Sequence, residues 1–241
     1  MRVPTDGRVL IIPDIHDKIA RAEQIIGAED PAHVVFLGDY FDGFDTGTRE
    51  ARRTAAWLKK SVRMPDRTHL LGNHDAGYMT LNPELACSGR TAEKERIISK
   101  AGIEWDRMRL YCWAGEWLCS HAGLSARLCR AEGWDAQEAL RRADREMHAI
   151  DDRMPPGPCL AAGRSRGGTG EVGGMTWCDY AEFEDIPGTR QIFGHTRGDV
   201  RHVKSGDTEH YCIDTELKSY AILEDGVMEI RNIAGTEAGG Q

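Results

Sequence analysis

The stretch Val34-Val35-Phe36-Leu37-Gly38-Asp39-Tyr40-Phe41-Asp42 places a short apolar run directly before a polar end. Four apolar residues in a row, bounded by a turn signal, are typical of a strand that is buried on both faces in a parallel sheet. Gly38 and Asp39 close the strand, and Asp42 follows shortly after. Because function gathers at the carboxyl ends of parallel strands, this stretch predicts a buried strand that leads into a functional loop.

Similar strands are predicted on both sides of this stretch. Arg8–Pro13 precedes it and Thr68–Leu71 follows it, and each is short, apolar and closed by polar residues. Between these strands, Asp17 to Ile26 and Arg49–Val62 carry apolar residues at helical spacing. The order strand, helix, strand, helix, strand predicts a parallel sheet with right-handed crossovers.

The rest of the chain predicts further helices over Thr91–Lys100 and Asp135–Ile150 and a strand pair over Met108–Trp113 and Glu116–Ser120. Turn signals between short apolar runs then predict a C-terminal β-meander. Its strands are expected at Gln191–Phe193, Val200–Lys204, His210–Ile213, Ser219–Leu223 and Val227–Arg231. Together these elements predict an α/β sandwich.

The composition of the chain excludes several classes of function. The chain has 241 residues, a hydrophobic fraction of 40% and a net charge of −8, which suits a folded core and argues against coating of nucleic acid or anionic membranes. No apolar run approaches the ~18 residues of a membrane span, and the N-terminus lacks a secretory apolar region. The seven cysteines form no C-x-x-C pair. We therefore expect reduced thiols, a cytoplasmic protein, and neither a nucleic acid nor a membrane as partner.

Polar residues of the types that commonly bind metals follow five of the predicted strands. Burying this many ionisable groups without bound cations would be very costly, and carboxylate oxygen with imidazole nitrogen suits Mn, Fe and Zn. One Asp can bridge two ions, which lie ~3.5–4 Å apart in two-metal sites. The motifs are Asp14-Ile15-His16, Gly38-Asp39, Gly72-Asn73-His74-Asp75, Ser120-His121-Ala122-Gly123-Leu124 and Phe193-Gly194-His195-Thr196.

This series, from Asp14 to Thr196, resembles the calcineurin-like metallophosphoesterases. The spacing Gly38-Asp39-Tyr40-Phe41-Asp42 and the run His121–Ser125 resemble the phosphoprotein phosphatase branch, including its short bacterial and phage members. Trp177-Cys178-Asp179 is similar to the W-S-D element of that branch. The resemblance implies a four-layer α/β/β/α sandwich with a dinuclear metal site at the strand ends.

The resemblance also implies roles for individual residues. His74 would be the general acid, and Asp42 would orient it. The ions would be two divalent or trivalent metals, with manganese preferred over iron or zinc. The first metal would be held by Asp14, His16 and the bridging Asp39, and the second by Asp39, Asn73, His121 and His195.

The implied activity is hydrolysis of phosphomonoesters, with a metal-bridging hydroxide as nucleophile and a phosphorylated protein or a small phosphoester as substrate. Nuclease-like and cyclic-nucleotide branches end in G-H-x-H, but Arg197 stands in place of the second histidine. The chain therefore fits a serine/threonine phosphatase-like enzyme better than a nuclease. A dinucleoside-polyphosphate or nucleotide pyrophosphohydrolase is the alternative, with Tyr40, Phe41 or Trp177 as the aromatic that stacks on a base. A non-catalytic scaffold is disfavoured because the ligands and His74 are all present.

Two residues depart from the family pattern. Gly43 replaces an arginine that binds the substrate phosphate, and Asp17 replaces a glycine and adds a negative charge at the rim. Another arginine is then expected to bind phosphate, because its planar fork matches phosphate oxygens. The first candidates are Arg164 and Arg166 in the Gly-rich loop 163–174; the others are Arg190, Arg197 and Arg49.

The predicted domain organisation is one metallophosphoesterase domain over residues 1–233. Within it, residues 135–174 are expected to form a variable cap over the site, because loop-rich inserts often gate access. Residues 234–241 are expected to form a disordered tail.

Overall fold

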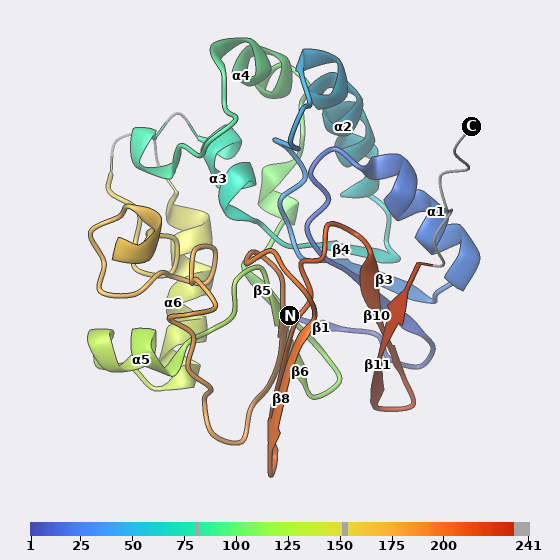
Figure 1. Cartoon of the computed structure of the whole chain (residues 1–241). Coiled ribbons are helices and arrows are strands. Elements are labelled where there is room, and N and C mark those ends of the chain that lie inside the picture. The colour runs from blue at the N-terminus through green and yellow to red at the C-terminus, as the bar shows by residue number, and fades with distance from the viewer. Residues whose placement is uncertain (81, 151–153, 234–241) are drawn as a thin grey trace, which may run out of the picture.

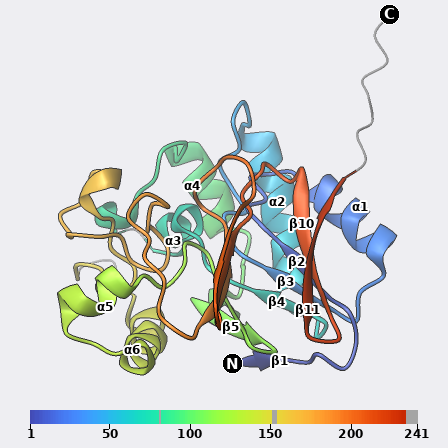
Figure 2. The same cartoon turned by 60° about the horizontal axis from the view of Figure 1, so that its bottom comes forward.

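The computed structural model describes residues 1–80, 82–150 and 154–233. Two β-sheets face each other in the middle of the molecule, and helices cover their outer sides (Figure 1). Figure 2 shows the same layers from another side, with α1 and α2 beside one sheet and α5 and α6 on the opposite side of the molecule. The predicted four-layer α/β/β/α arrangement is therefore confirmed.

The first sheet has the strand order β11-β10-β2-β3-β4. Strands β2, β3 and β4 run parallel and are joined by α1 and α2, as the alternation of strands and helices predicts. β10 pairs with β2 in the antiparallel sense. The bounds are β2 Val9–Ile12, α1 Ile19–Glu29, β3 His33–Phe36, α2 Thr48–Ser61, β4 Arg67–His69, β10 Ser219–Glu224 and β11 Val227–Asn232.

The second sheet has the order β1-β5-β6-β7-β9-β8. β5 and β6 form the predicted strand pair, which is antiparallel, whereas β7 runs parallel to both of its neighbours, β6 and β9. The bounds are β1 Arg2–Val3, β5 Tyr111–Ala114, β6 Trp117–Ser120, β7 Arg190–Phe193, β8 Arg201–Ser205 and β9 Thr208–Cys212.

The predicted C-terminal β-meander is wrong, although its strands are present. β7, β8 and β9 join the second sheet, whereas β10 and β11 complete the first. Turn signals report only where strands end, and the choice of sheet depends on burial against residues far away in the chain. In β10, Ala221 packs between the two sheets, while Ile222 packs on the helical side. Both faces of β10 are therefore buried, as both faces of its neighbour β2 are.

The apolar strands serve two hydrophobic layers at once. In β2, Val9 and Ile11 face the opposite sheet, while Leu10 and Ile12 face the helices. Side chains alternate between the two faces of a strand, and both faces are covered here. This explains why the strand sequences are apolar throughout.

The remaining helices lie around the sheets, and two of them begin after residues whose side chains cap a helix. Thr91 caps α4 by accepting a hydrogen bond from the Lys94 amide at 3.2 Å, and Asp135 caps α6 through the Glu138 amide at 2.7 Å. No helix in the described ranges is long and apolar enough to cross a bilayer. The bounds are α3 Asn73–Met79, η1 Pro83–Leu85, α4 Ala92–Ser99, η2 Trp105–Arg107, α5 Ala126–Glu132, α6 Ala136–Ala149 and η3 Arg164–Arg166.

The single domain over 1–233 and the cap over 135–174 stay predictions. The expected tail, 234–241, lies outside the described residues.

Leu10→Ala is expected to lower the free energy of unfolding by about 2–5 kcal/mol. Leu10 is fully buried in β2, the central strand of the first sheet. Val227→Ala is the control, because Val227 is 68% exposed on β11, and it should change the free energy by less than about 0.5 kcal/mol. Urea denaturation followed by circular dichroism measures both. Equal losses for the two variants would contradict this placement of Leu10.

Candidate active site

The polar strand ends of both sheets meet in one place. The amides of Ile15 and His16 both donate to the carbonyl of Asp39, at 3.0 and 2.8 Å, and the Gly194 amide donates to the His121 carbonyl at 2.8 Å. These bonds tie neighbouring strand ends together. His16, Asp39, Asp42 and His195 all have left-handed backbone angles, with φ from 43° to 66°, so the chain turns sharply at the point where each side chain is presented.

One group of donor atoms comes from Asp14, His16 and Asp39, and these atoms lie within 4.8 Å of one another. The His16 Nδ1–H donates to the Phe41 carbonyl at 2.8 Å. The other ring nitrogen, Nε2, is the one that can face an ion, and it lies 3.7 Å from Asp39 Oδ2. An imidazole held in this way by a backbone carbonyl is the usual arrangement of a metal-binding histidine.

A second group comes from Asp39, His121 and His195, again within 4.8 Å. The His121 Nδ1–H donates to the Leu37 carbonyl at 3.0 Å, so Nε2 carries a lone pair. That Nε2 lies 3.0 Å from Asn73 Oδ1 and 3.2 Å from His195 Nδ1. The Asn73 amide nitrogen points to Cys87 Sγ at 3.2 Å, which turns its oxygen toward the histidines.

These two acceptor-rich groups fit bound cations. Burial and the charges of Asp214 and Asp39 raise the pKa of Asp14, and burial lowers the pKa of His121 and His195. Burial would also raise the pKa of Asp39, but the surrounding imidazoles hold it below its usual value. Imidazole nitrogens and carboxylate oxygens therefore converge on two shared points, and a bound cation would satisfy both kinds of donor. The mixture of oxygen and nitrogen donors suits Mn, Fe or Zn.

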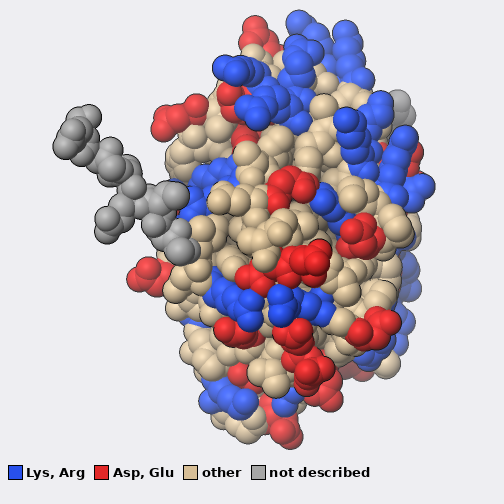
Figure 3. Space-filling view, turned by 90° about the vertical axis from the view of Figure 1, so that its right-hand side faces the viewer, with Lys and Arg blue, Asp and Glu red and all other residues tan. Residues whose placement is uncertain are grey.

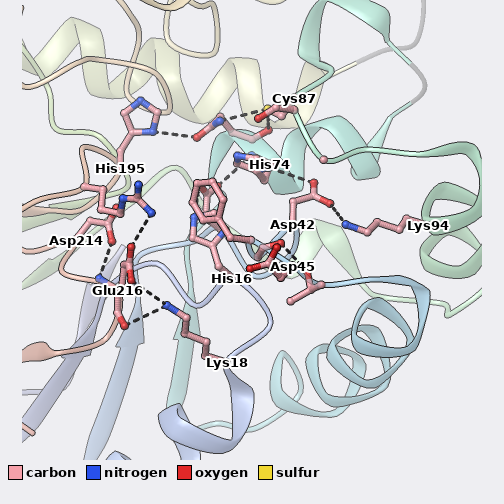
Figure 4. A pocket seen from close by; sticks show the side chains of 18 of the residues that line it. His16, Lys18, Asp42, Asp45, His74, Cys87, Lys94, His195, Asp214 and Glu216 are labelled. Carbon is pink, nitrogen blue, oxygen red and sulfur yellow. Dashed lines mark hydrogen bonds and ion pairs between the residues drawn. The ribbon is translucent and has the colours of Figure 1, made fainter. Parts of the chain in front are cut away.

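His74 and Asp42 form a pair at the edge of these groups (Figure 4). The His74 Nδ1 lies 3.1 Å from Asp42 Oδ2, while Asp42 Oδ1 accepts from the Tyr78 hydroxyl at 2.7 Å and from Lys94 Nζ at 2.8 Å. Burial would lower the pKa of His74, but the charge of Asp39 and the hydrogen bond that His74 donates to Asp42 raise it. The pair can therefore hold a proton facing the pocket.

Asp75 positions Asp39, a role that the sequence reasoning missed. Its carboxylate accepts hydrogen bonds from the amides of Asp39, Tyr40 and Gly72 at 2.7, 2.9 and 2.9 Å. It thereby fixes the turn after β3 against the start of α3. The sequence indicated Asp75 only as the last residue of the motif Gly72–Asp75, and its place in the first turn of α3, three positions after Gly72, could have indicated its role.

The two departures from the family pattern form one structural unit. Asp17 adopts φ 64°, and its carboxylate accepts hydrogen bonds from the Gly43 amide at 3.2 Å and from Thr46 Oγ1 at 2.6 Å. Thr54 Oγ1 donates to the other oxygen at 2.7 Å. Asp17 therefore anchors loop 43–47 and does not line the pocket. A Cβ on Gly43 would lie 2.4 Å from the His16 carbonyl oxygen, which leaves no room for a side chain there.

The pocket has a volume of about 1220 Å³, and basic residues from several segments line it. Arg166 is one, and its guanidinium pairs with Asp179 at 2.8 Å. Arg197 is another; it lies 4.6 Å from the centre of the Phe44 ring and pairs with Glu216 at 2.6 Å. Arg164, Arg190 and Arg49 do not line the pocket.

Lys94 also lines the pocket, and motif spacing did not indicate it because it comes from α4. Asp214, which follows β9, is a second lining residue that was not assigned a role. Of the aromatic residues considered for stacking on a base, Tyr40 and Phe41 are fully buried, so they pack in the core and are not available to a base. Trp177 does line the pocket.

Gly194→Ala is expected to weaken binding of Mn²⁺ on the order of 10- to 100-fold, the range for disturbing the surroundings of a ligand. A Cβ at this position would lie 2.0 Å from Asp14 Oδ1 and would displace that carboxylate. Gly27→Ala is the matched control, since a Cβ there meets nothing within 4 Å. Isothermal titration calorimetry measures both, and unchanged affinity in Gly194→Ala would contradict the role of Asp14.

Comparisons with known proteins agree with this geometry. The family model of calcineurin-like phosphoesterases matches residues 7–197. A cold-active protein-tyrosine phosphatase from a psychrophilic Shewanella species is similar in structure, with a TM-score of 0.61 and 14% identity over 95% of this chain and 80% of that chain. A protein serine/threonine phosphatase from Saccharomyces cerevisiae gives a TM-score of 0.55 and 11% identity over 97% and 82%. At these identities the two structures show a shared fold, and no curated protein matches the sequence. Because the family model spans most of its length, the chain belongs to the calcineurin-like phosphoesterase family.

Proposed function

We propose that this phosphoesterase hydrolyses phosphomonoesters and acts as a serine/threonine phosphatase-like enzyme on phosphorylated proteins or small phosphoesters. The observation that carries the proposal is the pair of donor groups that share Asp39, with the His74–Asp42 pair beside them. Two cation sites next to a proton-holding imidazole supply what this reaction needs, namely charge stabilisation and a general acid.

We assign the first metal to Asp14, His16 and Asp39. Asn73, His121 and His195 would hold the second together with Asp39. Manganese is the preferred ion, with iron or zinc as alternatives that the same donors accept. When bound, two such ions lower the pKa of water and neutralise phosphoryl oxygens.

The chain's own residues would then act on the leaving group and the phosphate. His74 would donate a proton to the departing oxygen, and Asp42 would hold the ring in place for that transfer. Arg166 would bind phosphate oxygens through its fork, since its pairing with Asp179 fixes the guanidinium at the pocket wall. We do not assign phosphate binding to Arg164, because it does not line the pocket.

Arg197 supports a monoesterase over a diesterase. It occupies the position of a second metal-binding histidine in diesterase branches, and it cannot replace that ligand because a guanidinium has no lone pair to offer. Its contacts are instead with Phe44 and Glu216. We further propose that the enzyme acts in the cytoplasm, because all seven cysteines carry free thiols.

One observation favours the alternative, a dinucleoside-polyphosphate or nucleotide pyrophosphohydrolase. Phe44 is 77% exposed although it lines the pocket. Arg197 lies against its ring. An exposed ring with a guanidinium beside it is a surface on which a base can stack.

A substrate panel tests the assignment. Phosphoserine peptides and p-nitrophenyl phosphate, each with Mn²⁺, are expected to be hydrolysed faster than bis-p-nitrophenyl phosphate and dinucleoside polyphosphates. His74→Asn should lower kcat by about 10²- to 10⁴-fold, the usual contribution of a general acid, while Mn²⁺ binding is retained. Faster cleavage of the diester would contradict the monoesterase assignment, and faster cleavage of dinucleoside polyphosphates would favour the alternative. If the wild type and His74→Asn were equally inactive on every substrate, the enzyme assignment would fail and the non-catalytic scaffold would remain.

Asp42→Asn is expected to move the alkaline limb of the kcat/KM profile to lower pH. The Asp42 carboxylate helps to raise the pKa of His74, so its loss lowers that pKa, and the acid form of His74 then disappears at a lower pH. Tyr78→Phe is the control, because it removes one hydrogen bond to Asp42 at 2.7 Å but keeps the negative charge. The control should shift the limb less. A limb that stays in place in Asp42→Asn would show that His74 is not the titrating acid.

A further inference from the structure

A second concave surface lies between α2 and α4, apart from the catalytic pocket. Its volume is about 880 Å³, and no acidic residue lines it. The small aliphatic residues Ala55, Ala56, Ile97 and Ala101 contribute apolar surface. We call it the basic groove, because its other lining residues are all cationic: Arg52, Lys59, Lys60, Arg63, Arg96 and Lys100.

Helical spacing explains how the cations gather. On α2, Arg52, Ala55 and Lys59 are three and four residues apart, so they share one face of the helix. Arg96 of α4 and Lys100, the residue directly after its end, are four apart in the same way. The two faces lie opposite each other at the end of the molecule that is uppermost in Figure 1, and Figure 3 shows Lys and Arg side chains gathered there.

The charges of the groove are largely uncompensated. Among the described residues, Arg63 is the only one of its cations with a carboxylate within ion-pair distance, that of Glu104. Most of its cationic residues are well exposed to solvent, and yet the chain as a whole carries a charge of −8. Like charges placed side by side repel one another, so an anionic partner in the groove is electrostatically favoured.

The apolar surface decides which kind of anion fits. Nucleic acid bound as a single strand is held by aromatic rings that stack on the bases, and no ring lines the groove. Ala56, Ala101 and Ile97 instead offer apolar surface among the cations, and we call this surface the apolar strip. We propose that the basic groove docks an acidic amphipathic segment of a partner protein, with its carboxylates on the lysines and arginines and its apolar side chains on Ile97 and the alanines.

Helix α4 separates this docking site from the catalytic pocket. Lys94 of α4 lines the pocket, whereas Arg96 and Ile97, two and three residues further on, line the basic groove. A segment in the groove would therefore leave the catalytic pocket open and lie one helix away from it. Docking and hydrolysis can be measured separately, so the docking proposal does not depend on the proposed function.

Fluorescence anisotropy with a labelled helical peptide tests the proposal. The peptide is about four turns long, with glutamates along one face and leucines along the other. The groove variant is Lys59→Glu/Lys100→Glu, with one change in α2 and one directly after α4. The control, Arg2→Glu/Lys204→Glu, alters net charge equally but away from the groove. The wild type and the control should bind the peptide, more weakly as salt rises, and the groove variant should bind at least about tenfold more weakly.

Far-ultraviolet circular dichroism and thermal unfolding should be equal in all three proteins, which shows that the fold is intact. If the groove variant does not fold, Lys59→Gln/Lys100→Gln replaces it, with a smaller but measurable loss of binding expected. Equal peptide binding by the groove variant and the control would overturn the proposal. Tighter binding of a single-stranded oligonucleotide of equal charge would overturn the choice of a protein partner. Equal binding of a peptide with the same residues in scrambled order would overturn the role of the apolar strip.

Discussion

The carboxylate of Asp39 belongs to both groups of candidate metal-binding atoms. The strand ends around it are bonded to one another in a way that holds it there. Backbone bonds from Ile15 and His16 to the Asp39 carbonyl fix the loop after β3 to the loop after β2. Asp75 holds the Asp39 amide from the other side at 2.7 Å. Because a bridging ligand must face both groups at once, small shifts of either sheet would separate them. The two-sheet core therefore sets the geometry of the site as well as the stability of the fold.

Much of the fold was predictable from the sequence, because apolar runs and helical spacing are local signals. The three parallel strands and the helices between them follow from such runs. The assignment of the last five strands to two sheets did not, since β10 pairs with β2 through contacts between residues such as Ala221 and Ile11, far apart in the chain. Such pairing depends on burial that no turn signal encodes.

The residues of the candidate site also fall into those that the sequence indicated and those that it did not. Asp14, His74 and the other strand-end residues were predictable, because their position after apolar runs carries the information. Lys94 and Asp75 were not, because one arrives from α4 and the other acts through backbone amides. Asp17 was identified as a departure, but its role was visible only when loop 43–47 was seen bonded to it at 2.6 Å through Thr46. Gly43 and Asp17 thus belong to one bonded loop, and the next residue in that loop, Phe44, lines the pocket.

The acceptor-rich centre also links metal supply to folding. Asp14 is buried beside Asp39 and Asp214, and burial and these neighbours raise its pKa, so its charged form is disfavoured in the metal-free fold. An ion that binds the folded chain and not the unfolded one shifts the equilibrium toward the folded state as its free concentration rises. The lifetime of this protein in a cell would then follow the availability of the metal. A chain that fails to acquire its ions would unfold more often and reach proteases sooner, so that metal scarcity would lower the amount of protein as well as its activity.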